Sequence, residues 1–141
     1  MDNATFNFIT IILSLAALAF SLFNFHKDQV FKKTSTETEL LNTISNALNH
    51  LSESNKSMSV FEDDDSPLGT SIQDAFQSAL IGVLEAYNDA CYKFSINAVH
   101  KKRFLTIYRE DILNLFNDKS YAHIINNDKF IYLHEFYNKH H

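Results

Sequence analysis

The feature that most constrains the fold is an uncharged stretch at the N-terminus. No Asp, Glu, Lys or Arg lies between Asp2 and His26. The 23 residues of this stretch would form roughly 35 Å of α-helix, and the hydrocarbon core of a bilayer is roughly 30 Å thick. Residues 1–26 are therefore predicted to be a transmembrane helix.

The alternative for the same stretch is a secretory signal peptide that is cleaved off. Ala17-Leu18-Ala19 has the small-x-small pattern of a cleavage site. However, the first residues carry Asp2 in place of Lys or Arg, and six largely apolar residues, 20–25, follow the cut. These two departures favour an uncleaved anchor.

The charges that flank the stretch predict its orientation. Lys27, Lys32 and Lys33 follow it, whereas no Lys or Arg precedes it. Since cytoplasmic flanks carry an excess of Lys and Arg, we expect the inner (cytoplasmic) membrane, with the N-terminus outside and the C-terminal part in the cytoplasm. The single cysteine, Cys91, excludes an internal disulfide and agrees with a reducing compartment.

The rest of the chain has the composition of a helical protein. It has enough apolar residues for a core, 45% of the whole chain, and only two Gly and one Pro to make tight turns. Residues 27–69 are predicted to be a juxtamembrane helix and an acidic linker, and residues 70–141 a cytosolic helical domain. The expected fold class is all-α, an N-terminal transmembrane helix plus a small cytosolic bundle of four or five helices.

Helical periodicity defines the expected elements. A short amphipathic helix would have an apolar face made of Leu41, Ile44, Leu48 and Leu51. A linker would cover 53–69, a helix that starts at Ser71 with Asp74 in a capping-box position would run to Ser95, and two short helices would follow Tyr121. Another helix, from about His100, would bury Phe104, Ile107, Tyr108, Ile112, Leu115 and Phe116.

Small and polar residues recur along one edge of the apolar stretch. They follow alternating steps of three and four residues: Asn3, Asn7, Thr10, Ser14, Ala17, Ser21 and Asn24. These steps match the heptad of a left-handed helix bundle, and such residues let membrane helices approach closely and form hydrogen bonds. We expect a homo-oligomer in which this stripe is either a dry seam or the lining of a water-filled or gated pore. A lone helix without a partner is the third alternative.

A basic window lies in the C-terminal half. Five cations and no acid occur between positions 93 and 109, in a chain whose net charge is −5. With the adjoining histidine, the candidate ligand residues are Lys93, His100, Lys101, Lys102, Arg103 and Arg109. Cations near a helix N-terminus can bind an anion such as phosphate. The alternatives are a solvated helix start and a face turned to anionic lipid headgroups. The overall acidity argues against a nucleic-acid duplex as a partner.

Signals for an enzyme are weak. The sequence has no Gly-rich phosphate loop, no G-x-S-x-G and no H-E-x-x-H, and the nearest string places the next histidine six positions after His134. Cys91 falls on the apolar face of its helix and is expected in the core. The acidic run 62–65 lacks the spacing of a calcium loop. We expect no catalytic residue, no metal site and no cofactor.

Two resemblances add to these expectations. Residues 84–112, with Leu84, Tyr87-Asn88, Cys91, Arg103-Phe104 and Tyr108, resemble the C-terminal part of a group of small bacterial single-pass membrane proteins of unknown function. In plan alone, a short span followed by a small helical domain, the chain is similar to the membrane effectors that accompany type III CRISPR systems. That second resemblance implies a cytosolic domain that binds a cyclic oligoadenylate and a role in antiviral defence.

Two functions are expected from the sequence. The first is a membrane-anchored oligomeric effector or sensor that binds an anionic ligand, such as a cyclic nucleotide, and perturbs or gates the membrane. The second is a passive membrane-anchored protein-interaction module with no ligand and no pore. Membrane lipid and further copies of the chain are the expected partners.

Overall fold

The computed structural model describes the backbone of residues 3–61 and 67–141 and the side chains of residues 11–60 and 67–141. Within these ranges all regular secondary structure is helical, which confirms the predicted all-α class. The elements are α1 (Asn3–Phe61), α2 (Pro67–Ser95), α3 (Lys101–Asn117), the 3-10 helix η1 (Asp128–Phe130) and α4 (Ile131–His140).

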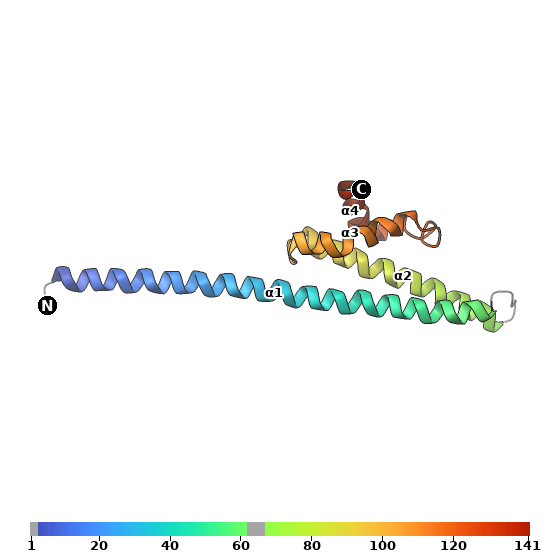
Figure 1. Cartoon of the computed structure of the whole chain (residues 1–141), viewed down its shortest axis with the longest axis horizontal. Helices are drawn as coiled ribbons and strands as arrows, with labels where there is room; N and C mark the ends of the chain where they lie inside the picture. Colours follow the sequence, from blue (N-terminus) through green and yellow to red (C-terminus); the bar gives the residue numbers. More distant parts are fainter. Residues whose placement is uncertain (1–2, 62–66) are drawn as a thin grey trace.

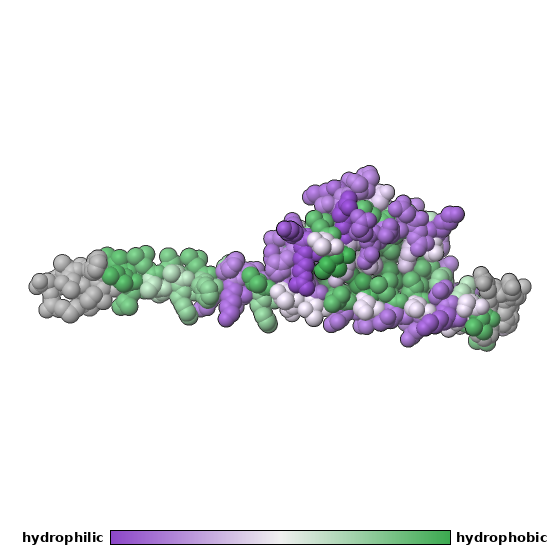
Figure 2. Space-filling model, viewed as in Figure 1, coloured by the Kyte–Doolittle hydropathy of each residue, from purple (hydrophilic) through white to green (hydrophobic). Residues whose placement is uncertain are grey.

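Helix α1 is 59 residues long, which corresponds to about 90 Å. Its N-terminal half projects as a lone rod, and its C-terminal half lies against the other helices (Figure 1). In the part of the chain described here, α1 is the one helix long and apolar enough to cross a membrane. Residues 11–30 are exposed throughout, and the coloured part of this rod is mostly apolar, with a hydrophilic band just before the packed helices (Figure 2).

Helix α2 folds back along the C-terminal half of α1 to form an antiparallel hairpin (Figure 1). The inner face of α1 presents side chains at steps of four, three and four residues: Leu40, Ile44, Ala47 and Leu51. α2 faces them with a similar stripe that includes Leu80, Val83, Leu84 and Tyr87. Such spacing is typical of a left-handed helical pair, in which side chains of one helix fit between those of the other.

The remaining helices cover the far side of α2. Fully buried Phe104 and Ile112 of α3 and Leu133 of α4 complete one continuous core with the hairpin. Cys91 is 2% exposed in this core, as expected. The Phe94 ring packs against the Phe104 ring, tilted by 35° with 4.9 Å between ring centres, and so joins the end of α2 to the start of α3.

The inner face of α1 differs from the predicted one. Leu41 and Leu48 were expected to point inward, but they are 55% and 41% exposed, whereas Leu40 is fully buried. Both sets of positions have helical spacing, so periodicity alone does not choose between them. The hairpin selects the set that contains Ala47, a small residue that lets α2 approach closely.

The predicted breaks in the chain also change. The expected linker 53–69 is shorter, because α1 continues to Phe61 and α2 already begins at Pro67; residues 62–66 lie outside the described residues. Proline suits the first turn of a helix, where its missing N–H costs nothing. Ser71 therefore lies inside α2 and does not cap it. After Tyr121 one 3-10 turn and α4 replace the two short helices expected.

Candidate functional site

The basic window lies where the projecting half of α1 meets the packed helices. Residues 96–100 turn the chain from α2 into α3, with Asn97 in the left-handed region at φ 60° and Val99 fully buried. His100 is the N-cap residue of α3, but its own side chain does not cap the helix. The first N–H groups of α3 therefore need another acceptor.

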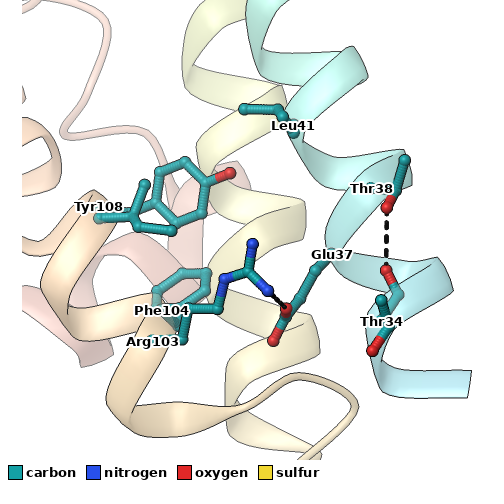
Figure 3. Close-up of a pocket in the computed structure, with 8 residues that line it drawn as sticks. Thr34, Glu37, Thr38, Leu41, Arg103, Phe104 and Tyr108 are labelled. Atoms are coloured by element: carbon teal, nitrogen blue, oxygen red, sulfur yellow. Dashed lines mark hydrogen bonds and ion pairs between the residues drawn. The ribbon is translucent and has the colours of Figure 1, made fainter. Parts of the chain in front are cut away.

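Glu37 of α1 accepts from one of these groups, the backbone N–H of His100. Its Oε1 accepts a hydrogen bond from the backbone N–H of His100 at 2.8 Å and lies 2.8 Å from Nδ1 of the same histidine. Nη1 of Arg103 lies 3.3 Å from Oε2 of Glu37 (Figure 3). The Glu37 side chain is only 14% exposed. A carboxylate thus occupies the positive end of α3, where an anion is favoured. We call Glu37, His100 and Arg103 the carboxylate clasp.

Lys93 is held beside the clasp by two acids. Its Nζ lies 3.0 Å from Oδ2 of Asp89 and 3.4 Å from Oε1 of Glu39 on α1. Partial burial opposes its charge, but the hydrogen bonds and charges of Asp89 and Glu39 outweigh this effect and raise the pKa of Lys93. Lys93 therefore joins α2 to α1 next to the clasp.

The other predicted ligand residues differ in their surroundings. Nζ of Lys101 lies 5.4 Å from the centre of the Phe94 ring, a distance at which a cation is attracted to an aromatic face. The side chain of Lys102 is exposed. Arg109 lies elsewhere: its Nε and Nη2 donate to the carbonyl of His140 at 3.1 and 2.6 Å, so it holds the end of α4.

The structure thus brings His100 and Arg103 together at Glu37 and places Lys93 at the neighbouring Glu39, but it does not bring in Arg109. The two acids of α1 were missed from the sequence. Their signal was weak, because Glu37 and Glu39 stood out only as the charged residues in an otherwise uncharged run from 34 to 52. Which cations they pair with depends on how α3 packs.

A small cavity adjoins the clasp between α1 and α3 (Figure 3). Its volume is about 90 Å³, and its lining includes Thr34, Thr38, Leu41 and Tyr108. Pockets that bury a small organic ligand usually measure about 300–1,000 Å³, so this cavity is too small for a nucleotide. Burial, followed by the charge of Glu37, raises the pKa of Tyr108, so its hydroxyl stays protonated near the clasp.

Two further groups bear on the expected chemistry. Burial raises the pKa of Cys91, so its thiol stays protonated in the core, and a thiol is a much weaker nucleophile than a thiolate. Among the residues whose positions are described, no group of three or more His, Cys, Asp or Glu could hold a metal ion. The acidic run 62–65 falls outside these residues.

The polar stripe lies on the projecting half of α1. Its side chains from Ser14 onward are described, and Ser14, Ala17, Ser21 and Asn24 are all exposed on one uninterrupted helix. The side chains of Asn3, Asn7 and Thr10 lie outside the described residues. The geometry therefore leaves the stripe accessible to another helix.

Comparison with known proteins gives no match: no family model matches the chain, and neither a curated protein nor a solved structure is significantly similar to it. The two resemblances inferred from the sequence therefore stay predictions. The carboxylate clasp and α1 are the features of the chain that bear on its function.

Proposed function

We propose that the protein is a membrane-anchored, oligomeric effector or sensor of the inner membrane whose cytosolic helices bind an anionic ligand at the start of α3. The observation that carries this proposal is the carboxylate clasp. Glu37 acts there as an internal anion, held by the backbone N–H of His100 and by Arg103. A phosphate group of a ligand would find the same donors and carry more charge than one carboxylate.

Ligand binding would act on α1 by displacing Glu37. Lys101 and Lys102 at the entrance to α3 would contribute two further cations. Once displaced, Glu37 would no longer fix α3 to α1. Glu37 follows His26 by 11 residues of the same helix, or about 16 Å, so the change would start close to the span. Because α1 is one continuous helix, this change would reach the oligomeric span, which would then perturb or gate the membrane.

A cyclic nucleotide second messenger, as used in antiviral defence, is the ligand that we propose for this site. In a symmetric oligomer, copies of the clasp would lie around one axis, which suits a symmetric ligand. Because the 90 Å³ cavity is too small for a nucleotide, the ligand would bind at the surface by its phosphates.

The same ion pairs favour a second candidate, a passive membrane-anchored interaction module. Glu37, Glu39 and Asp89 already neutralise much of the basic window, so in this view the cations serve only to hold α3 and α2 on α1. The two candidates differ in the expected effect of losing the Glu37 carboxylate. In the ligand-binding effector its loss would expose an anion site, whereas in the passive module its loss would only weaken the packing of α3 on α1.

Binding of cyclic di- and trinucleotides and of inorganic phosphate to the full chain in nanodiscs tests the proposal. The Lys101→Ala/Lys102→Ala/Arg103→Ala variant should lose binding but keep its helicity, because the two lysines are exposed charges that contribute little to stability and the backbone N–H of His100 still holds Glu37. Glu37→Gln should bind more tightly, since it removes the internal competitor.

The matched control replaces two exposed lysines far from the clasp, Lys56→Ala/Lys119→Ala, and should bind as the parent does. If the parent binds none of these anions, or if Glu37→Gln binds them no better, the ligand function is wrong and the passive module is favoured.

A further inference from the structure

The exposed side of α1 that borders α3, here called the outer face, carries no charge over about five turns. The exposed Glu39 lies beside this face and pairs with Lys93 of α2 at 3.4 Å. The members of the outer face between positions 34 and 52 are all exposed: Thr34, Ser35, Thr38, Leu41, Asn42, Ser45, Leu48, Asn49 and Ser52. Surfaces that face water usually contain roughly 25–35% charged residues. A face of this length without one charge is therefore unusual for a surface that only meets solvent.

This face is in phase with the polar stripe of the projecting half. Seven-residue steps lead from Ala17 through Asn24 and Phe31 to Thr38 and Ser45, and α1 has no break between them. A strict seven-residue repeat follows one seam along a left-handed supercoil. The two features therefore form one continuous line along a single helix.

Large apolar side chains accompany this line outside the apolar half of α1. Phe31 is 74% exposed and Leu41 55% exposed, and Ile107 of α3, beside Leu41 at the rim of the small cavity, is 46% exposed. Small hydroxyl and amide side chains alternate with them, as they do in the stripe. This mixture of small, polar and apolar groups fits a second helix and offers little to a charged partner.

We propose that a second copy of the chain packs in parallel on this outer face, so that the helix contact continues from the span to about Leu48. Two copies anchored in one membrane have the same orientation and are concentrated in two dimensions. A two-fold contact between them places each residue opposite its own copy, and between Thr34 and Leu48 no like charges meet across the outer face.

The proposal rests on the proposed function in one respect, because it assumes that the spans associate. It adds that the cytosolic contact borders the clasp of each copy, because Thr34, Thr38 and Leu41 of the outer face also line the cavity that adjoins the clasp. Displacement of Glu37 in either copy would then act on a helix pair and not on a lone rod.

Disulfide cross-linking of the full chain in liposomes tests this contact with two matched positions. Thr38 lies on the outer face and Thr43 on a flank; both are exposed, and each hydroxyl donates to the carbonyl four residues earlier at 3.0 Å. Thr38→Cys should form roughly five times more disulfide dimer than Thr43→Cys, because a disulfide requires Cα atoms within about 7 Å of each other. Buried Cys91 can remain in place.

Asn24→Cys, at the end of the span, separates this inference from the function. If Asn24→Cys forms dimers but Thr38→Cys forms no more than Thr43→Cys, the contact ends at the membrane and the inference is wrong, while the oligomer stands. If neither forms dimers, the oligomer and the inference both fall. Dimers of Asn24→Cys and Thr38→Cys without dimers of Thr43→Cys support the proposal.

A charge placed on the face provides a second, independent measurement. Ser45→Lys would bring two like charges together across the contact, whereas Asn46→Lys, the adjacent exposed position, would not. Ser45→Lys should shift the full chain in detergent toward monomer at an unchanged melting temperature, and Asn46→Lys should not. Equal behaviour of the two variants would overturn the proposal.

Discussion

The two halves of α1 share one backbone conformation but face different surroundings. In the projecting half, large apolar residues such as Leu13 and Phe20 are 64% and 67% exposed, and no described side chain there is buried. In the packed half, Leu40 and Ile44 are 0% and 4% exposed against α2. A helix that is apolar all round needs a core or lipid, whereas a helix with one apolar stripe needs a single neighbour.

This difference shows that local hydrogen bonds determine the helical backbone of α1. The distribution of its side chains determines what packs against it. Hydrogen bonds between residues four apart build both halves alike. Only the packed half has an inner face that α2 covers and an outer face, uncharged between positions 34 and 52, that α2 leaves open. Substitutions on each of these surfaces test this contrast.

The largest effect is expected from the inner face. Leu40→Ala should lower the free energy of unfolding by about 2–5 kcal/mol, because it removes buried methyl groups and leaves a cavity. Leu41→Ala, the next residue and half exposed, should change it by less than about 1 kcal/mol. Chemical denaturation of the full chain in micelles, followed by circular dichroism, measures both. Similar losses for the two variants would mean that the faces of α1 are assigned wrongly.

A smaller loss is expected where α1 meets α3. Glu37→Gln keeps the shape of the side chain but removes its charge, and it should cost about 1–2 kcal/mol, since hydrogen bonds to a charged group are stronger than neutral ones. Glu53→Gln, on an exposed part of α1, serves as the control and should be neutral in the same unfolding measurement. If the free energy of unfolding of Glu37→Gln equals that of the parent, the clasp does not hold α3 in place.

The projecting half should respond through association and not through folding. Ser14→Leu/Ser21→Leu adds bulk on the stripe and should weaken the proposed oligomer, in which each interhelical hydrogen bond would be worth about 0.5–2 kcal/mol. The control, Leu15→Ser/Leu22→Ser, changes the neighbouring face. Cross-linking in detergent compares the two, and the seam requires that the stripe variant has the larger effect. If the protein also conducts ions when ligand is present, the stripe variant should lose that activity.

The smallest effect is expected from the C-terminal histidine. Burial, with smaller contributions from the charges of Lys139 and Arg109, lowers the pKa of His140 below its ordinary 6.5. The unfolded chain then binds a proton more readily than the folded one, so this contribution to stability is present above pH 6.5 and is lost as the pH falls below it. His140→Phe, which keeps the ring against Phe136, should reduce that loss in unfolding curves at pH 7.5 and 5.5. An equal loss of unfolding free energy between pH 7.5 and 5.5 in the parent and in His140→Phe would contradict this role of His140.

Sequence patterns determined the helical class and most of the core of the C-terminal helices. Cys91, Phe104 and Ile112 were predicted to be buried and are buried, because a helix whose apolar residues fall on one stripe has only one face to bury. Ile107, predicted on the same stripe, is 46% exposed. It lies at the edge of that stripe, and whether an edge position is covered depends on the neighbouring helix.

Tertiary structure decided what periodicity left open. Leu40 and Leu41 both fit a helical repeat, and only the close approach of α2 at Ala47 turned Leu40 inward. Glu37 could have faced water, but the packing of α3 brought the free N–H of His100 within 2.8 Å of it. A spacing rule describes contacts along one helix, whereas these contacts join residues 63 positions apart. Their partners are therefore fixed only when the helices have packed.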